Sequence, residues 1–432
     1  MSDRLPAALF VYRLLSAAAM PLAPMMLKAR QRRGKEPVDR LLERRGRASR
    51  PRPPGALVWL HAASVGELAS VLPLIARIAT REVCVLVTTG TVTSSGLAAE
   101  RLPRGAIHQY APVDVPRYVR RFLDHWRPDL ALFVESDLWP NRILEASRRR
   151  IPMIMVNARL SENSFKRWRF LPASIVNLLQ RIDLCLARTA GDAERLSALG
   201  APRIVTAGDL KLDVPPPPCD AAKLAALRDA IGRRPLIAAA STHDGEERAM
   251  IEVHMRLRAQ FPGLLTLIVP RHPERGAAVT VQAGGAGLTA RLRSRGELPT
   301  PATDVYVADT VGELGIIYRL APVVFVGGSL VRHGGQNPIE PAKLGAAILH
   351  GPHVWNFADI YAALDAAHGA ERVEDTSRLT AGLAALMMQP AARQNVADNA
   401  HATVSGLSGA LERTLHAIEP YFMQLRLLGP DA

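Results

Sequence analysis

Glu67 combines a reactive side chain with a position that suits catalysis. It lies in the stretch VWLHAASVGELAS, residues 58–70, which we interpret as a strand, a tight loop and a helix, because small residues separate an apolar run from apolar residues at helical spacing. A carboxylate where such a helix begins is a candidate general base. Ser64 and Glu67 also have the spacing of a helix-capping box, so the local pattern leaves a purely structural role open.

A second pair of carboxylates follows another strand of the first half. The apolar run 130–134 ends in the motif ESDLWPN, residues 135–141, which places Glu135 and Asp137 just after a strand. Ligands of open α/β sheets collect outside the carboxyl ends of the strands. Two carboxylates at such a point, followed by Trp and Pro, are not typical of a turn selected only for solubility.

The densest site pattern of the second half is GGSLVRHGGQNPIEPA, residues 327–342. Its two Gly-Gly pairs allow the backbone to approach a ligand closely. Asn337 can cap the next helix with Pro338 at the first helical position, and Glu340 lies three residues after the cap. We interpret the stretch as a nucleotide site, with a phosphate at the helix N-terminus and a carboxylate that accepts from ribose hydroxyls.

Two other expected strand ends of the second half carry charged residues. The motif PRHPER, residues 270–275, brings Arg271, whose planar guanidinium matches phosphate oxygens. The motif DTVGELG, residues 309–315, places Glu313 between glycines. The sequence contains no Walker loop, no GxGxxG fingerprint, no Asp-x-Asp and no His/Cys cluster, so it gives no reason to expect an ATPase, a dinucleotide enzyme or a metal site.

The order of these motifs indicates the fold. Strand, polar loop and helix recur along the 432 residues, a length that favours two domains. We therefore predict two doubly wound parallel α/β domains, separated by the proline run that starts at residue 215. The expected boundaries are an N-terminal arm at 1–50, a first domain at 51–214, a second domain at 215–410 and a last helix at 411–432 that returns to the first domain.

The net charge of +14 implies an anionic partner, such as a nucleic acid, a phosphorylated substrate or an anionic membrane. The excess is local, since residues 28–52 contain eleven Lys and Arg against three Asp and Glu. Aromatic residues make up 5% of the chain, which is little for base stacking. The three cysteines have no paired spacing, and this indicates a reducing compartment, with Cys84 and Cys185 packed in strands.

The apolar stretch 5–27 is interrupted by Arg13 and by two prolines. We expect a helix embedded in, or lying on, a membrane rather than a clean span. The cations that would face anionic headgroups are Lys28, Arg30, Arg32, Arg33 and Lys35. The alternative is a helix that packs on the first domain while the arginines are simply solvated.

Six motifs, in this order, resemble one family: the 3-deoxy-D-manno-octulosonic acid (Kdo) transferases of lipopolysaccharide synthesis, which have the GT-B fold of two Rossmann-like domains. They are HAASVGE, ESDLWPN, NARLS, GDLKLD, PRHPER and GGSLVRHGGQNPIEPA, and they extend over nearly the whole chain. The resemblance implies an inverting glycosyltransferase that moves Kdo from CMP-Kdo to the lipid A precursor. It also implies a location on the cytoplasmic side of the inner membrane, anchored by the N-terminal segment, with no cofactor, no metal and no nucleic acid partner.

The resemblance also assigns roles to residues of this chain. Glu67 becomes the general base, and Glu135 and Lys211 stabilise the transition state. Glu67 is then expected to point toward the second domain and not back to its own helix. The residues that match the family's CMP site are Pro270, Arg271, Gly312, Glu313, Leu314, Asn337, Pro338, Ile339 and Glu340. Asp137 departs from the family's pattern, in which many members carry Glu.

Two other functions agree with part of the sequence. A GT-B enzyme of different specificity, or a nucleotide-sugar epimerase, shares the two-domain frame but does not explain the apolar arm. A non-enzymatic basic protein that binds a membrane or RNA explains the charge but not the carboxylates at the strand ends.

Overall fold

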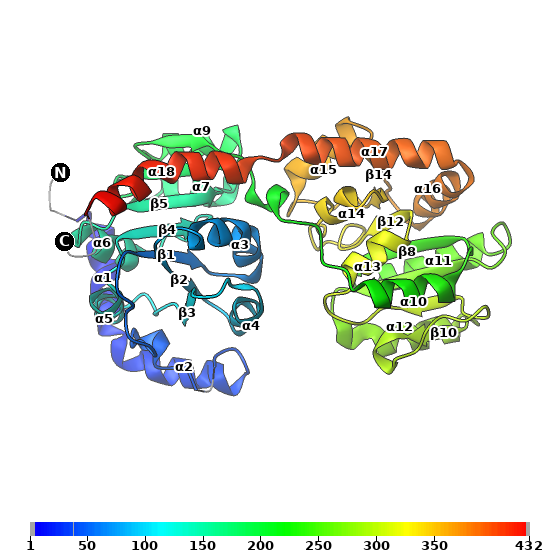
Figure 1. Cartoon of the computed structure of the whole chain (residues 1–432), viewed down its shortest axis with the longest axis horizontal. Helices are drawn as coiled ribbons and strands as arrows, with labels where there is room; N and C mark the ends of the chain where they lie inside the picture. The colour runs from blue at the N-terminus through cyan, green and yellow to red at the C-terminus, as the bar shows by residue number, and fades with distance from the viewer. Residues whose placement is uncertain (1–4, 38, 429–432) are drawn as a thin grey trace. The chain divides into compact units, whose positions relative to one another are not determined.

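The computed structural model describes residues 5–37 and 39–428. They form two compact units, Met1–Val214 with Ser408–Ala432, and Pro215–Leu407. Each unit is built around one seven-stranded sheet whose paired strands are all parallel, with helices on both faces (Figure 1). This confirms the predicted class of two doubly wound, Rossmann-like domains.

The first sheet has the strand order β3-β2-β1-β4-β5-β6-β7. Its strands are β1 Leu57–Ala62, β2 Cys84–Thr89, β3 Ile107–Tyr110, β4 Leu130–Val134, β5 Met153–Ala158, β6 Leu184–Ala187 and β7 Ile204–Thr206. Its helices are α3 Val65–Ala79, α4 Val92–Arg101, α5 Pro116–Trp126, α6 Pro140–Arg148, α7 Glu162–Arg169, α8 Pro172–Leu179, α9 Ala190–Ala198, the short η3 Leu210–Asp213 and α18 Ala410–Leu428. The central strand β1 pairs with β2 on one side and with β4 on the other, so the direction of winding reverses between β1 and β4.

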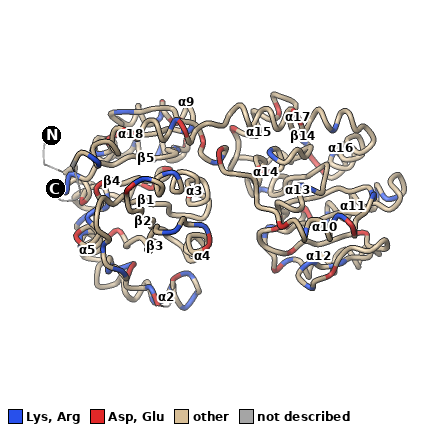
Figure 2. Tube along the Cα trace, in the orientation of Figure 1, with Lys and Arg blue, Asp and Glu red and all other residues tan. Residues whose placement is uncertain are grey.

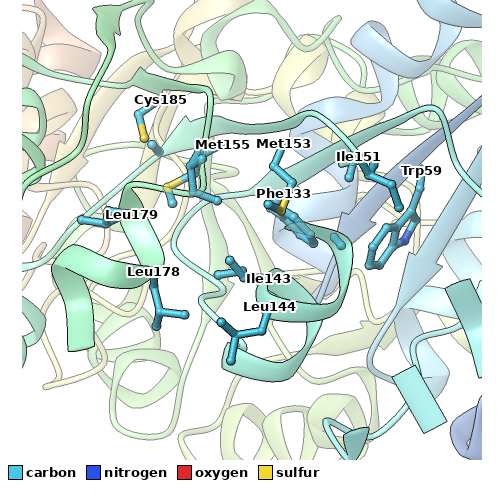
Figure 3. Packing of buried hydrophobic residues seen from close by; sticks show 14 of the residues in the cluster. Trp59, Phe133, Ile143, Leu144, Ile151, Met153, Met155, Leu178, Leu179 and Cys185 are labelled. Atoms are coloured by element: carbon cyan, nitrogen blue, oxygen red, sulfur yellow. The ribbon is translucent and has the colours of Figure 1, made fainter. Parts of the chain in front are cut away.

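The inner strands of this sheet, such as β4 and β6, are continuous apolar runs because helices cover both faces. On one face, Trp59 and Phe133 pack edge to face with ring centroids 5.2 Å apart, and Figure 3 shows further side chains of this cluster, including Ile143 of α6. On the other face, Ile418 and Phe422 of α18 join the core formed with α3. The C-terminal helix is therefore part of the first unit's core.

The second sheet repeats the arrangement with the order β10-β11-β9-β8-β12-β13-β14. Its strands are β8 Leu236–Thr242, β9 Leu265–Pro270, β10 Ala290–Leu292, β11 Val305–Val307, β12 Val323–Val326, β13 Ala347–His350 and β14 Ala370–Arg372. Its helices are α10 Ala221–Ile231, α11 Glu246–Leu257, α12 Gly276–Gly285, α13 Leu314–Leu320, α14 Ile339–Lys343, α15 Ala358–Ala366, α16 Thr376–Met388 and α17 Pro390–Leu407, with short turns η4 Pro273–Arg275 and η5 Arg293–Arg295. The reversal of winding falls between β8 and β12.

The N-terminal arm consists of α1 Ala7–Ala18, η1 Met20–Leu22 and α2 Ala23–Arg32, and the turn η2 Glu43–Arg45 follows. One side of α1 is fixed to the first unit. Leu9 is buried there, the Tyr12 hydroxyl donates to Asp114 at 2.9 Å, and Arg13 is paired with the buried carboxylate of Glu145. The arginine that interrupts the apolar stretch thus attaches the arm to the protein.

The other side of the arm is apolar and exposed. Phe10, Leu14 and Leu15 of α1 are 58–64% exposed, and Met25 of α2 is 70% exposed. Within 5–37 and 39–428 no single helix is long and apolar enough to span a membrane, whereas α1 and the η1–α2 segment pass that test together, with a bend of 43° between them. The arm therefore packs on the protein with one side and presents an apolar surface with the other.

Lys and Arg recur along α2 and the segment after it (Figure 2). Lys28, Arg32 and Arg33 are exposed, as a headgroup-binding role requires. Arg30 differs from the expectation, because its guanidinium donates at 2.8 Å to the buried carboxylate of Glu36. Arg30 therefore holds the turn after α2 in place.

Candidate active site

The carboxyl ends of β1 and β4 bring the candidate catalytic residues of the first unit to one edge of its sheet. Glu67 follows β1 in the first turn of α3, and Glu135 follows β4 directly. These two neighbouring strands are the ones between which the winding reverses. In open α/β sheets this is where the connections leave in opposite directions and a ligand crevice forms.

The carboxylate of Glu67 binds groups at the start of its own helix. One oxygen accepts from the Ala63 N–H at 2.7 Å, the other accepts from the Ser64 hydroxyl at 2.9 Å, and the Ser64 hydroxyl oxygen accepts from the Glu67 N–H at 3.3 Å. The expectation that Glu67 does not point back to its helix is therefore wrong. The physical reason is that the loop before α3 leaves N–H donors without helical partners, and a carboxylate in the first turn satisfies them.

These contacts do not prevent Glu67 from acting as a base. Burial raises the pKa of its carboxyl group to about 7, although the hydrogen bonds from Ala63 and Ser64 lower it, and the nearby charges of Glu135 and Asp137 raise it further. A group with a pKa near the operating pH is well suited to accept a proton in a transition state. The same contacts that cap α3 fix the direction of the carboxylate.

Glu135 and Lys211 form an ion pair beside this site, with 3.3 Å between the Lys211 ammonium and a Glu135 carboxylate oxygen. Glu135 has a backbone φ of 58°, a left-handed conformation that costs a residue with a Cβ about 1 kcal/mol or more. Lys211 lies in η3, which is held because the Asn157 side-chain oxygen accepts from the Leu210 N–H at 3.0 Å. The ion pair is therefore held by three segments that are far apart in sequence, those that carry Glu135, Asn157 and Lys211.

A buried network that the sequence analysis missed lies next to Glu135. The Nε2 atom of His61 is 2.7 Å from an Asp137 carboxylate oxygen and 2.6 Å from a guanidinium nitrogen of Arg142. His61 and Arg142 are almost completely buried, and burial, followed by the Arg142 charge, lowers the pKa of His61. Asp137 is therefore bound to the end of β1 and to α6, and the loop that carries Glu135 is held at both ends. The sequence features that could have revealed this network are the histidine of HAASVGE and the Asp of ESDLWPN.

The corresponding edge of the second sheet is organised by Glu246 at the start of α11. Its buried carboxylate accepts from the N–H groups of Gly328, Ser329 and Leu330 after β12, at 2.7, 3.0 and 3.0 Å, and from that of His243 after β8 at 2.9 Å. Glu246 therefore joins the loops that follow β8 and β12, the strands at the reversal of winding. The sequence analysis did not single out Glu246.

The glycine-rich loop after β12 is shaped first by the protein itself. A Cβ on Gly327 would lie 2.6 Å from the Ser241 carbonyl oxygen, and Gly334 has a φ of 92°. The helix that follows begins at Ile339, one residue later than expected, with Pro338 as its N-cap. The Asn337 side-chain oxygen nevertheless accepts from the Ile339 N–H at 3.0 Å, which is the capping bond that the sequence predicts.

Glu340 lies in the first turn of this short helix. Its carboxylate accepts from the Asn337 amide at 3.2 Å, and burial raises the pKa of Glu340. Asn337 and Glu340 thus form one polar unit with Pro338 and Ile339 between them. A partly buried carboxyl group with one side-chain donor of this kind has acceptor capacity left for a hydroxyl group.

Pro270 is the last residue of β9, and Arg271 follows with an exposed side chain and a backbone N–H that donates to the Thr242 carbonyl at 2.9 Å. Arg271 therefore lies at the carboxyl edge of the sheet, beside the loop after β8, as the sequence predicts. Its guanidinium is available to an anion in solution or in a substrate.

The Gly312–Glu313–Leu314 segment ends in α13, and Gly312 has a φ of 86°. The carboxylate of Glu313 is occupied by the chain itself, since it accepts from Arg293 at 2.9 and 3.0 Å and from Lys223 at 3.1 Å. The Arg293 hydrogen bonds lower the pKa of Glu313 to about 2. Glu313 therefore fixes the loop, and the backbone is the part of this segment that is free to meet a ligand.

Histidines that the sequence analysis did not assign also lie at this edge. His243 stacks on His333 with ring centroids 4.0 Å apart, and its Nε2 atom is 3.0 Å from the amide nitrogen of Gln336. Burial, then the charges of His333 and other neighbours, lowers the pKa of His243 to about 4. The ring is thus neutral near pH 7 and able to exchange a hydrogen bond.

Among the residues that the structure describes, no three His, Cys, Asp or Glu side chains are arranged to hold a metal ion. Cys185 is fully buried in β6, and burial raises the pKa of its thiol to about 12, which agrees with the packed thiol expected there. Cys84 at the start of β2 is only partly buried.

Comparison with known proteins identifies the family of this chain. Residues 39–214 match the family model described as 3-deoxy-D-manno-octulosonic-acid transferase (kdotransferase). The chain is 37% identical over 387 residues to the 3-deoxy-D-manno-octulosonic acid transferase of Bordetella pertussis, covering 87% of this chain and 90% of the relative. It is 34% identical over 392 residues to the transferase of the same name from Haemophilus influenzae, covering 89% and 91%.

A glycosyltransferase structure from Rickettsia africae superposes with a TM-score of 0.59 at 10% identity, covering 85% of this chain and 99% of that one. This likeness concerns the fold alone, and it agrees with the GT-B class. The identity to the curated relatives extends through both units. The chain therefore belongs to the family of 3-deoxy-D-manno-octulosonic acid transferases.

Proposed function

We propose that this enzyme transfers Kdo from CMP-Kdo to a hydroxyl group of the lipid A precursor with inversion at the anomeric carbon. The observation that carries the proposal is the Glu67 carboxyl group, whose pKa is raised to about 7 beside the Glu135–Lys211 ion pair. A base of this pKa at the reversal of winding is the group that an acceptor hydroxyl requires.

The bonds change as follows. The acceptor oxygen forms a bond to the anomeric carbon of Kdo, the bond from that carbon to the phosphate oxygen breaks, and CMP leaves with the electron pair. Glu67 takes the hydroxyl proton. Positive charge develops at the anomeric carbon in an oxocarbenium-like transition state, and negative charge develops on the departing phosphate. A carboxylate such as Glu135 stabilises the first charge, and a cation such as Lys211 stabilises the second.

For the donor we propose a CMP site at the carboxyl edge of the second sheet. Arg271 presents an exposed guanidinium at this edge, and its planar fork suits the phosphate. Asn337 and Glu340 offer an amide and a partly buried acceptor to the sugar or base, with Pro338 and Ile339 as the backbone between them. Pro270 and the Gly312–Leu314 turn complete the site. Arg271→Ala should weaken CMP binding in calorimetry more than acceptor binding, whereas equal losses would contradict this division of roles.

The direct test of the proposed reaction is product analysis by mass spectrometry. The full-length protein is incubated with CMP-Kdo and a tetraacyl lipid A precursor, and we expect a mass increase of one or more Kdo residues together with release of CMP. CMP release without any Kdo-bearing lipid would contradict the proposed acceptor. Retention of full activity on soluble acceptors after removal of residues 1–50 would favour a transferase of different specificity.

We also propose that the arm lies in the cytoplasmic leaflet of the inner membrane. The apolar side of α1, with Leu14 and Leu15 more than half exposed, is followed by the exposed cations of α2 and the segment after it, a combination that suits an anionic leaflet. Replacing Leu14 and Leu15 by Asp should abolish flotation with vesicles that contain an anionic phospholipid. Val281→Asp, at a position 75% exposed on α12, is the control that should leave flotation unchanged.

A further inference from the structure

A cavity of about 450 Å³ lies in the second unit, away from the candidate donor site. Its lining includes the residues that precede three strands: Arg233–Leu236 before and at the start of β8, Phe261 before β9 and Pro322 before β12. Arg271 and the glycine-rich loop follow β9 and β12. The cavity is thus at the amino edge of the sheet, about 20 Å along the strands from the carboxyl edge.

Five arginines line this cavity: Arg228, Arg233, Arg234, Arg319 and Arg393. None of the residues that line it is Asp or Glu. Five like charges around one cavity repel one another, and the repulsion is reduced only by solvent or by an anion. Such a set is the type of site that binds a phosphate group, since the guanidinium fork matches phosphate oxygens in pairs.

Two of the five arginines bind backbone carbonyl groups and stabilise the fold. Arg234 donates to four backbone carbonyls, among them those of Gly263 and Thr303, and Arg319 donates to the carbonyls of Pro217 and Gly315. Arg228 lies in the last turn of α10, where the negative end of the helix dipole favours a cation. Helix ends therefore account for part of the positive charge.

Across residues 5–37 and 39–428, the guanidinium groups of Arg228, Arg233 and Arg393 have no hydrogen-bond acceptor and no carboxylate partner in the protein, although the end of α10 favours a cation at the position of Arg228. They come from the end of α10, the turn before β8 and the first turns of α17. Phe261 and the ends of α13 and α16 supply the apolar part of the wall. Three free cations from three segments share one cavity with an apolar side.

We propose that this arginine cavity, defined by the five arginines above, is a second binding site that takes a phosphate-bearing ligand and is distinct from the donor site. The phosphate binds Arg228, Arg233 and Arg393, and the structural arginines hold the wall. A soluble phosphorylated compound and an anionic phospholipid headgroup present the same chemistry, so the test includes both.

The test uses the full-length protein with saturating CMP, so that the donor site is occupied. Binding of inorganic pyrophosphate is measured by titration calorimetry. Binding to phosphatidic acid vesicles is measured by flotation, with phosphatidylcholine vesicles as the blank, and every protein in the flotation assay also carries Leu14→Asp and Leu15→Asp so that the arm does not contribute. The site variant is Arg228→Gln, Arg233→Gln and Arg393→Gln combined. The charge-matched control replaces three exposed arginines of the same unit that lie outside the cavity, namely Arg248, Arg258 and Arg378.

We expect saturable pyrophosphate binding that is weakened about tenfold or more in the site variant and is unchanged in the control, because each charge-assisted bond removed contributes strongly. A loss seen only with phosphatidic acid vesicles supports the proposal and identifies the lipid headgroup as the source. Equal binding by the site variant and the wild type, equal losses in both variants, or no binding of either probe overturns it. If the triple variant does not fold, Arg393→Gln alone is compared with Arg378→Gln.

Discussion

Replacing Glu67 by Gln separates the two roles of this carboxylate, because the change removes the charge and the base while it keeps the size of the side chain. The pKa of Glu67 rises from the usual 4.5 to about 7 on folding, chiefly through burial. A group whose folded pKa is raised contributes stability that is fully present below 4.5 and is lost as the pH increases through 7. The ionised carboxylate therefore destabilises the wild-type fold at alkaline pH.

The size of this effect follows from the two pKa values. The full difference corresponds to about 3 kcal/mol at about 1.4 kcal/mol per pH unit. Part of Glu67 remains exposed, and solvent screening reduces the effect, so we expect about 2 kcal/mol between about pH 5 and about pH 8.5. Over that interval the stability of Glu67→Gln relative to the wild type should increase by this amount. Any hydrogen bond that Gln fails to make is lost at both pH values and cancels.

Urea unfolding followed by tryptophan fluorescence is a suitable assay, because four of the five tryptophans, Trp59, Trp126, Trp139 and Trp168, belong to the first unit. Glu100→Gln, which changes an exposed glutamate at the end of α4, is the control and should follow the wild type at both pH values. The reasoning is refuted if the difference between Glu67→Gln and the wild type does not change with pH.

The same variant should lose Kdo transfer by about a hundredfold or more, the range for removal of a general base. In the wild type, kcat/KM should increase with pH around a midpoint near 7, because the deprotonated carboxylate is the active form. CMP affinity should stay at the wild-type value. Wild-type turnover in a folded Glu67→Gln protein would leave only the capping role.

Three further variants test the groups around the two sites. Lys211→Met should reduce kcat by about a hundredfold with little change in CMP affinity, measured by product formation and calorimetry, because a transition-state cation is lost; an unchanged kcat would contradict that role. Glu246→Gln should lower the free energy of unfolding in urea by about 3 kcal/mol and should weaken CMP binding, because it leaves buried N–H donors without a full set of acceptors. Unchanged CMP affinity would show that the two loops do not depend on Glu246. Glu313→Gln should be less stable than the wild type above pH 4.5, because the Arg293 contact lowers the pKa of Glu313. The difference in free energy of unfolding should shrink as the pH falls toward 2. A difference that does not depend on pH would refute the contribution of the ion pair.

Much of the fold could be predicted from the sequence because its central strands are continuous apolar runs with polar loops after them. The strand expected at 130–134 agrees with the structure in every residue. The sequence analysis did not assign β10, β13 and β14. Two of these strands, β10 and β14, lie at the edges of the sheet and contain charged residues, so they lack the continuous apolar run by which the central strands are recognised.

The parts of the sites that escaped prediction depend on contacts between segments far apart in sequence. Glu246 lies at the start of a helix, where a glutamate is common. Its carboxylate oxygens nevertheless accept hydrogen bonds from a loop more than eighty residues later. His61 and Arg142 are 81 positions apart and meet only because β1 and β4 are neighbours in the sheet. Local patterns report helix caps and strand ends, whereas a buried polar network is set by which strands pair.

The geometry of Glu67 is compatible both with capping α3 and with the proposed catalytic role. The hydrogen bonds from Ala63 and Ser64 that cap α3 lower the pKa of Glu67, yet burial at the same helix start raises it more. A helix end that satisfies a carboxylate completely would hold it ionised and weakly basic, while burial without those bonds would leave its direction undefined. Because both act on one side chain, the carboxylate is oriented by its own helix and still titrates near 7. A sequence pattern that predicts a helix cap is therefore also compatible with a general base. The degree to which the helix start is buried decides whether the capping carboxylate titrates near neutral pH.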